Sequence, residues 1–532
     1  MPAPASETTP QEDTVTYRPS HARDITRPGF LVKLVLMMLV DALGVYGVVT
    51  AAMVGSWLIV GVLVLLLALA NFVYFSSRMV PAKYLMPGLV FLLVYQVFVM
   101  GYTGYVSLTN YGQGHNSTKA DAVSAILLQN QKRVDGSPTI TVAVVEKDGT
   151  LGLAIEDPTT KAIRVGTATH PLESVEGATA GATGITSVPG YTVLPFAELV
   201  ARQSELSGLT VPVSEDPADG YYVTTDGSQG YLAKSVYSYD NATDAMTNSE
   251  TGVAYRDNGR GSFVADDGTA LTPGWRVFVG TSNYTNMLVG KDLGGPFAKA
   301  LGWSFVFSLG SVLTTFALGL FLALVFSDTR VRGRKVYQSL LILPYAFPAF
   351  LATLVWKGML NEKFGFVNQV ILGGHQIPWL TDGMLAKASI LGVNLWLGFP
   401  YMFLVSLGAL QSLPSDIIEA AKIDGAGPLR TVWSVKLPLV LQSTVPLLIA
   451  SFAFNFNNFS LIYMLTGGGP NYPGLSVPIG ETDILISMVY KIAFDRGGQD
   501  YGLASAMSIV IFVVVGLISW WGFRRTKTLE EL

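Results

Sequence analysis

The chain has 532 residues, of which 50% are hydrophobic and 14% are charged. Soluble domains usually carry about a quarter charged residues, so this deficit indicates that lipid forms part of the solvent. The net charge of −4 argues against a nucleic-acid partner, and the absence of cysteine excludes disulfides, thiolate catalysis and Cys-ligated metal sites. The histidines are scattered without metal-ligand spacing, so we expect neither a bound metal nor a cofactor on this chain.

The first residues, 1–29, are polar and proline-rich, with no apolar core. This composition predicts a disordered tail rather than a cleavable signal peptide. Three apolar stretches follow within residues 30–108, near Leu31–Thr50, Ser56–Phe75 and Tyr84–Leu108. Each is close to the roughly 20 residues that a membrane helix needs. Asp41 places a carboxylate in the first stretch, and the sequence assigns it no role.

Residues 109–293 form a long hydrophilic stretch after the third apolar helix. Asp148-Gly149 is typical of a tight hairpin turn, and Ala120–Asn130 favours a helix. We therefore expect a folded β-rich (α+β) insert domain rather than a linker. Its strand-like runs are Thr139–Val145, Leu151–Ile155, Gly220–Val223 and Arg276–Gly280.

Residues 294–526 supply the remaining apolar helices. A short cytoplasmic tail, residues 527–532, is expected after them. With the first three, they predict an α-helical polytopic membrane protein with about eight transmembrane helices. A further apolar segment, Thr482–Phe494, is too short to span a bilayer and is expected at the outer interface. The spanning segments lie near Phe297–Phe326, Tyr337–Met359, Leu385–Leu410, Leu437–Leu465 and Tyr501–Phe523.

Basic residues gather before the first helix, in three of the connecting loops and after the last helix. Arg332, Lys422 and Arg525 are examples. All of these segments fall on one side of the membrane if the number of helices is even, and cytoplasmic loops carry the excess of Lys and Arg. We therefore expect a multi-pass protein of the prokaryotic cytoplasmic membrane, with both termini cytoplasmic and the insert extracytoplasmic.

The cytoplasmic loop at residues 414–438 has the pattern of a short helix, a tight glycine turn and a second helix. The first helix starts after Pro414, with Ser415 or Asp416 as the expected N-cap. Its small apolar residues, such as Ile417 and Ala421, form a surface outside the membrane. Such a surface needs a partner to cover it.

The seventh helix carries three asparagines, which are costly in lipid and favour a functional role. In a continuous helix Ser451, Asn455 and Asn458 share one face, with Phe454 beside them. Carboxamides both donate to and accept from hydroxyl groups, and an aromatic ring can cover the apolar face of a sugar. The alternative, that these residues join neighbouring helices by hydrogen bonds, stays open at this stage.

Two other helices add to this pattern. Asn394, Leu397, Gly398 and Tyr401 share a face of the sixth helix, and Tyr345 sits between Pro344 and Pro348, where a bend is expected. Together these residues indicate a polar, partly aromatic pocket without obvious charge. A carbohydrate suits it better than a phosphate or an amino acid, although either tyrosine alone could be an interfacial anchor.

The loop at 414–438 resembles the EAA loop of ABC importer permeases, since it reads E-A-A-K-I-D-G-A with Pro438 at the expected distance. In that family the loop docks in a cleft of the ATPase subunit and transmits its closure. The chain has no G-x-x-x-x-G-K-[ST] sequence, so ATP and Mg are expected on a separate ATPase. The resemblance implies coupling roles for Glu419, Ala420, Ala421, Asp424, Gly425, Ala426 and Pro438.

Several segments resemble the MalF-type permease subunit of maltose importers: Leu340–Pro348, Trp396–Tyr401, Ala450–Phe459, Leu465–Pro470 and Gly498–Ala504. The resemblance implies a second, MalG-type permease beside this chain in the lipid bilayer, a dimer of ABC ATPase subunits and an extracytoplasmic sugar-binding protein as partners. It departs at Ala349, where a member of the family has a hydroxyl, so the exact sugar stays open. The sugar contacts it implies are Tyr345, Leu397, Gly398, Tyr401, Ser451, Phe454, Asn455 and Asn458.

The sequence thus predicts a transport subunit without a catalytic residue, which moves maltose or malto-oligosaccharides inward by alternating access. Another neutral oligosaccharide such as trehalose is an alternative. An ion-coupled secondary transporter is a second, but neither inverted repeats nor intramembrane carboxylates are apparent from Phe297 onward. A membrane-anchored receptor is a third, and it would leave the EAA loop unexplained.

Overall fold

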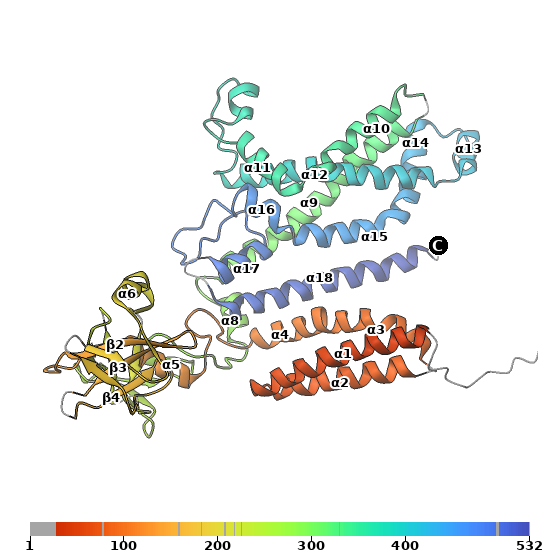
Figure 1. Ribbon diagram of the computed structural model, residues 1–532. Coiled ribbons are helices and arrows are strands. Elements are labelled where there is room, and N and C mark those ends of the chain that lie inside the picture. Colours follow the sequence, from red (N-terminus) through yellow and green to blue (C-terminus); the bar gives the residue numbers. More distant parts are fainter. Residues whose placement is uncertain are drawn as a thin grey trace, which may run out of the picture. The chain divides into compact units, whose positions relative to one another are not determined.

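The computed structural model describes residues 28–530, apart from 77–78, 158–159, 182–183, 207–208, 217–218, 225, 329 and 496–498. The expected disordered tail, 1–29, therefore lies almost wholly outside the described residues, and 531–532 lie outside them too. The chain forms two compact units, Met1–Gly101 and Tyr102–Leu532. Figure 1 labels the elements of both units.

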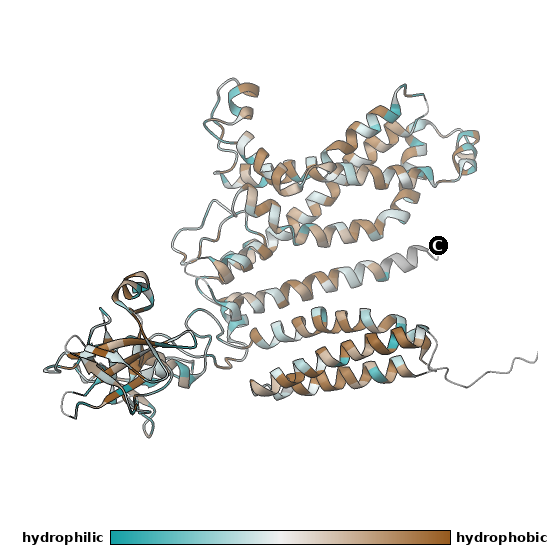
Figure 2. Ribbon diagram, viewed as in Figure 1, coloured by the Kyte–Doolittle hydropathy of each residue, from teal (hydrophilic) through white to brown (hydrophobic). Residues whose placement is uncertain are grey.

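The N-terminal unit is built from apolar helices that expose most of their side chains. Leu36, Leu43 and Leu65 are among the residues that are more than half exposed. Figure 2 shows that hydrophobic residues make up most of the length of α1 and α2. Exposed apolar side chains along whole helices form a far larger apolar surface than soluble monomers carry, so this surface is typical of a membrane-embedded unit. The helices are α1 (Pro28–Met53), α2 (Trp57–Phe75) and α3 (Val80–Leu92), continued by a π-helical turn (Leu93–Phe98) and α4 (Val99–Val106).

A polar pair lies between α1 and α2. The Asn71 amide donates a hydrogen bond of 2.7 Å to the Asp41 carboxylate, so this intramembrane carboxylate has a partner on the neighbouring helix. A Cβ at Gly44 would lie 2.4 Å from a methyl group of Leu67, so the glycine leaves room for this side chain between the two helices. The structure thus gives Asp41 a place in helix pairing.

The number of membrane spans agrees with a polytopic fold but is smaller than the expected eight. Among the described residues, six helical segments are long and apolar enough to cross a membrane. A seventh span results if the bent pair α10–α11 counts as one. The remaining expected span corresponds to α2, which is apolar but shorter, and its crossing stays a prediction. The six segments are Pro28–Met53, Val80–Val106, Gly294–Ser327, Gly383–Gln411, Pro428–Phe456 and Tyr501–Arg524.

The insert is built from antiparallel strands and short helices. Its main sheet has the order β5-β4-β3-β2-β11-β10-β9, with β1 paired to β11 and β8 paired to β2. These strands are β1 (Gln131–Arg133), β2 (Ile140–Lys147), β3 (Thr150–Glu156), β4 (Ile163–Thr167), β5 (Glu173–Ser174), β8 (Thr192–Val193), β9 (Thr210–Pro212), β10 (Tyr221–Thr224) and β11 (Gln229–Ser235).

The rest of the insert packs around this sheet. A second sheet, in the order β12-β13-β14-β15, is covered by α5, where Ile126 packs with Met246 and Phe263. The elements are α5 (Lys119–Gln129), β6 (Thr179–Gly181), β7 (Gly184–Ser187), α6 (Phe196–Ala201), α7 (Gln203–Leu206), β12 (Tyr237–Asp240), β13 (Ala245–Asn248), β14 (Ala254–Asp257) and β15 (Phe263–Val264).

The local predictions for the insert are mostly confirmed. The β2–β3 hairpin turns at Asp148 (φ 51°) and Gly149 (φ 78°), as a two-residue turn of this type requires. The predicted helix corresponds to α5, and three of the four predicted strands correspond to β2, β3 and β10. The predicted strand Arg276–Gly280 is wrong, because only Phe278 pairs there, in an isolated bridge with Thr109.

The two ends of the insert are joined to each other. Besides the Thr109–Phe278 bridge, the Val277 amide donates to the Asn110 side chain at 2.7 Å. The amide of Asn283 donates to the carbonyl oxygens of Ser107 and Thr109. The helix that follows, α8 (Ser282–Val289), packs on α9 and α18. The chain thus leaves and re-enters the helical part at one place.

The C-terminal helices pack closely through small residues. A Cβ at Gly319 of α9 would lie 2.6 Å from the backbone of Phe403 on α12, so glycine permits this crossing. The short helix α17 is largely buried and packs on α9 and α18, and its expected place at the outer interface stays a prediction. The helices are α9 (Gly294–Ser327), α12 (Gly383–Gln411), α15 (Leu437–Phe456), α17 (Leu485–Phe494) and α18 (Tyr501–Glu530).

Two of the spanning segments are broken. The predicted bend in the fifth helix is confirmed: α10 (Arg334–Ile342) and α11 (Ala349–Met359) are bent by 90° across a 3-10 turn, Leu343–Ala346. The seventh helix, expected to run unbroken over Leu437–Leu465, ends at Phe456, and α16 (Phe459–Leu465) follows. The physical reason is that the Asn458 side chain accepts from the Leu461 amide and so caps a new helix.

Candidate functional site

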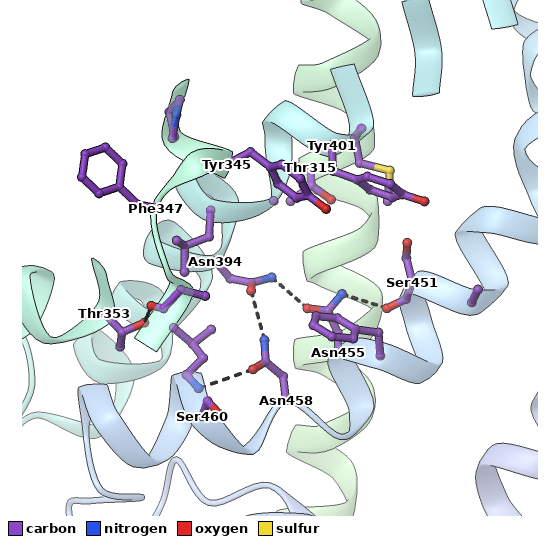
Figure 3. A pocket seen from close by; sticks show the side chains of 18 of the residues that line it. Thr315, Tyr345, Phe347, Thr353, Asn394, Tyr401, Ser451, Asn455, Asn458 and Ser460 are labelled. Carbon is purple, nitrogen blue, oxygen red and sulfur yellow. Dashed lines mark hydrogen bonds between the residues drawn. The ribbon is translucent and has the colours of Figure 1, made fainter. Parts of the chain in front are cut away.

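A cavity of about 570 Å³ lies between four helical segments of the C-terminal part. Its wall is formed by α9, the α10–α11 break, α12 and the α15–α16 break (Figure 3). All the residues for which the family resemblance implied sugar contacts line this one cavity. The structure therefore brings them together, and their contact with a sugar stays a prediction.

The polar wall of the cavity is a chain of three asparagines. Asn394 of α12 donates to the Asn455 carboxamide at 3.0 Å, and Asn458 donates to Asn394 at 3.5 Å. The Asn455 amide also donates to the carbonyl of Ser451 at 2.8 Å. Figure 3 shows these side chains converging on one side of the cavity. They therefore join α12 to both sides of the α15–α16 break, while the longer, weaker bond of Asn458 leaves capacity for a ligand.

The opposite wall is aromatic. The rings of Tyr345 and Tyr401 stack with their centroids 6.3 Å apart and 22° between their planes. Neither hydroxyl forms a hydrogen bond with another described residue. Tyr345 is 58% exposed, and Phe454, next to Asn455 on α15, is 71% exposed, so the cavity is open in the single chain.

Close helix packing shapes the floor of the cavity. A Cβ at Gly398 would lie 2.9 Å from the methyl group of Thr315 on α9, so glycine favours this close packing. The sequence reasoning missed Thr315, and it also missed Phe347, Thr353 and Ser460, which line the cavity as well. Thr315 and Thr353 carry no local signal of a site, and only the crossing of α9 with α12 and the 90° bend bring them to the wall. Phe347 and Ser460 lie beside the two helix breaks.

The cavity wall has no charged group. Among the described lining residues there is no Asp, Glu, Lys, Arg or His. Amide, hydroxyl and phenol groups therefore provide its polar contacts, next to apolar and aromatic surface. Elsewhere, no group of three His, Cys, Asp or Glu side chains that could hold a metal is found among the described residues.

The EAA loop has the predicted helix–turn–helix form. Its first helix is α13 (Ser415–Ile423) and its second begins with α14 (Pro428–Thr431), which continues through a π-helical turn, Val432–Lys436, into α15. Gly425, with φ 79°, ends α13 in the left-handed conformation. The amides of Gly425 and Ala426 donate to the carbonyls of Lys422 and Ala421, which is a Schellman cap.

The start of α13 differs from the prediction. Pro414 occupies the N-cap position, and neither Ser415 nor Asp416 caps the helix. Instead the Ser415 hydroxyl donates to the Asp416 carboxylate, because both residues already lie within the first turn. No residue of α13 is buried, and Ile423 is 85% exposed. The small apolar surface predicted for this helix is therefore uncovered in the single chain.

Comparisons with known proteins agree with this architecture. Residues 90–169 match the family described as the N-terminal part of the transmembrane subunit in binding-protein-dependent ABC transporters. Residues 315–524 match the family described as the binding-protein-dependent transport system inner membrane component. The second match covers the cavity helices and the EAA loop.

Curated relatives extend the match over most of the chain. The chain is 34% identical over 481 residues to the maltose/maltodextrin transport system permease protein MalF of Vibrio cholerae, covering 88% of this chain and 89% of that one. It is 35% identical over 492 residues to MalF of Vibrio parahaemolyticus, with 88% and 89% covered. It is 40% identical over 292 residues to MalF of Salmonella typhimurium, with 53% and 57% covered. The chain therefore belongs to the MalF family of transport system permease proteins.

Proposed function

We propose that this chain is the membrane permease subunit of an ATP-driven, binding-protein-dependent importer of maltose and malto-oligosaccharides. The names of its relatives support this proposal, since each is a maltose/maltodextrin transport system permease protein. The observation that carries it is the uncharged cavity of about 570 Å³, with asparagines on one wall and aromatic rings on the other.

The cavity suits a neutral sugar for two reasons. Sugar hydroxyls both donate and accept hydrogen bonds, and carboxamides and phenols match both roles. An anionic or cationic ligand would lose its hydration without a compensating charge, which is costly in a site of low dielectric. The stacked pair Tyr345 and Tyr401 offers a flat apolar surface beside these groups.

The chain is one half of a transport pathway in this proposal. The exposed aromatic side of the cavity, where Phe454 and Tyr345 lie, is closed by a second, MalG-type permease. A dimer of ABC ATPase subunits, which carries ATP and Mg, covers the apolar surface of α13. An extracytoplasmic sugar-binding protein docks on the side of the insert. The chain crosses the prokaryotic cytoplasmic membrane with both termini in the cytoplasm.

Transport then follows from the geometry of the helix breaks. Closure of the ATPase dimer moves α13, which continues through α14 and the π-helical turn into α15. The end of α15 carries Asn455 and is followed by the break at Asn457–Asn458. Movement of α15 therefore shifts one wall of the cavity against the other, which is the motion that alternating access requires.

Reconstitution of the complex in vesicles tests the function. The chain, a MalG-type permease and the ATPase would be supplied with a loaded sugar-binding protein, and uptake of labelled maltose, maltotriose and trehalose would be measured. We expect uptake that requires ATP and prefers maltose or maltotriose. Uptake driven by an ion gradient without the ATPase would overturn the proposal. A preference for trehalose would change the identity of the transported sugar, in keeping with the departure from the family at Ala349.

A further inference from the structure

A second cavity, of about 440 Å³, lies at the far ends of α11 and α16. Its volume is within the range of small-molecule sites. Its polar lining comes from the end of α11, the loop that follows, and the end of α16. These residues are Lys357, Asn361, Glu362, Lys363, Thr381 and Thr466.

The two cavities are arranged in series along the same two helices. On α11, Thr353 lines the first cavity and Lys357 lines the second. On α16, Leu461 lines the first and Leu465 lines the second. Both pairs are four residues apart, which corresponds to about 6 Å along a helix. The second cavity is therefore one helical turn beyond the first, in the direction away from the α10–α11 break.

A thin apolar layer separates the cavities. Leu461, Leu465 and Leu360 are at most 8% exposed and belong to one packed cluster, with Trp356 against it. All of these side chains are carried by α11, α16 or the residue directly after α11, and both helices follow a break in the chain. Movement at the two breaks can therefore part this layer without unfolding a helix.

The second cavity has unused hydrogen-bonding capacity. Lys357 and Lys363 line the cavity as exposed side chains, and neither ammonium group forms a hydrogen bond or ion pair with another described residue. The Glu362 carboxylate accepts only a long bond of 3.4 Å from the Thr381 hydroxyl. The Asn361 side chain accepts from the Lys363 and Phe364 amides and so shapes the loop. The Phe364 ring is 87% exposed.

This combination suits a polyhydroxy ligand better than an anion. A phosphate or carboxylate would be attracted by the lysines but repelled by Glu362 on the same wall. Sugar hydroxyls can use the ammonium groups as donors and the carboxylate as an acceptor at once. The exposed ring and the buried leucines at the base provide the apolar surface that such a ligand also covers.

We propose that the second cavity is an outer sugar subsite, which holds the trailing units of a malto-oligosaccharide whose leading units occupy the first cavity. This inference rests on the proposed function, because it takes the same ligand. Maltose fills the first cavity alone and does not need the subsite. Longer sugars reach across the parted layer and gain hydrogen bonds from Glu362 and Lys363.

A ratio of two sugars tests the subsite in the reconstituted complex. Transport of maltoheptaose and of maltose would be measured at saturating, fully loaded binding protein for the double variant Glu362→Gln, Lys363→Gln and for Lys357→Gln. Loss of a hydrogen bond to a charged group predicts that the maltoheptaose-to-maltose ratio falls roughly fivefold or more in the double variant. His375→Ala is the matched control, since this residue is exposed in the same loop and lines neither cavity.

The ratio compares two sugars in the same variant. A loss of assembly therefore lowers both transport rates and leaves the ratio unchanged. An unchanged ratio with normal maltose transport would overturn the subsite while leaving the proposed function intact. An equal fall for both sugars, with weaker docking of the binding protein, would show instead that the cavity receives a protein segment. If the unaltered complex transports neither sugar, it is the proposed function that fails.

Discussion

The first cavity and helix α13 both differ in polarity from their surroundings, but in opposite directions. In the cavity, polar groups lie inside an apolar bundle, and Asn394 and Asn455 are less than a tenth exposed. On α13, apolar groups lie outside, and Ile417 and Ile423 are 42% and 85% exposed. Each arrangement is costly in the single chain, and each becomes favourable when a ligand or partner of matching polarity arrives. The difference indicates which class of molecule each region binds.

In the insert, by contrast, the polarity of most side chains matches their surroundings. Among the described residues between Lys119 and Gly280, Thr224 is the single polar residue in the buried class, while the cores are aliphatic and aromatic. Most of its polar side chains lie at the surface, as expected for a domain that folds in water; the buried side-chain nitrogen of Gln131 is an exception. Its contacts therefore explain stability, whereas those of the cavity and of α13 need a functional explanation.

The largest expected effect concerns the side of the membrane on which the insert and the α9–α10 loop lie. The chain has no cysteine, so single cysteines can be introduced without background. Asp148→Cys, exposed at the β2–β3 turn, should react with an impermeant maleimide on intact cells, and Arg332→Cys should react only after permeabilisation. The reverse pattern would invert the topology and place α13 away from the ATPase.

The next effect concerns α13. Gly425→Asp forces a side chain into a left-handed conformation and distorts the Schellman cap, so transport and stimulated ATPase activity should be almost abolished. Gly427→Asp is the matched control, because Gly427 is the N-cap of α14 and aspartate is favoured there. Uptake, ATPase activity and ATPase association would be measured for both variants. Equal uptake in the two would refute a coupling role for this turn.

A smaller effect concerns the asparagine wall. Asn455→Ala and Asn458→Ala should each remove a hydrogen bond in the cavity, at a cost of about 1–3 kcal/mol, which lowers transport roughly tenfold. Asn457→Ala should have less effect, since its exposed amide donates only to the carbonyl of Ala453. Uptake per assembled complex separates the two roles of these residues. Unchanged uptake with lower thermal stability would show that the asparagines only join helices.

The smallest effect concerns the insert and tests whether its charges are structural. The Lys119 ammonium and the Tyr239 hydroxyl donate to the Asp244 carboxylate and hold its pKa below the usual range. This contribution to stability is present above the ordinary aspartate pKa of about 4 and is lost as the pH falls through the lowered value. The protection factors of the β12–β15 amides against hydrogen exchange should therefore fall at acidic pH.

Lys119→Met should weaken that acid dependence by removing the donor. Lys132→Met is the control, because Lys132 pairs with Glu250 at an exposed position of the same domain. The same acid dependence in the unaltered chain and in Lys119→Met would contradict the assignment of the effect to this carboxylate.

Much of the fold could be predicted from the sequence because lipid imposes a simple rule on helix length and polarity. The hairpin at Asp148-Gly149 and the turn at Gly425 were predictable from glycine alone, since both need positive φ. The break after Phe456 was not predicted, because it depends on the Asn458 side chain capping a new helix in place of continuing the old one. The sequence around Asn457–Asn458 is compatible both with a continuous helix and with a helix that ends there and is followed by a second one.

The candidate site was predictable only in part. The asparagines and tyrosines stood out because polar and aromatic groups at helical spacing are unusual in a membrane helix. Thr315 and Thr353 did not, since threonine in such a helix usually bonds to its own backbone, and both do so here. Their place in the wall depends on helix crossing and on the 90° bend, which are tertiary features.

The joined ends of the insert have an evolutionary consequence. The domain leaves the helical part after Thr109 and returns at Phe278, and these two residues are neighbours in a β-bridge. A domain whose two ends lie close together can be exchanged for a longer, shorter or unrelated domain, because the exchange does not displace the backbone on either side of it. The part of the chain that lies in water can therefore diverge, shrink to a turn or be replaced, while the helices that line the cavity keep their packing.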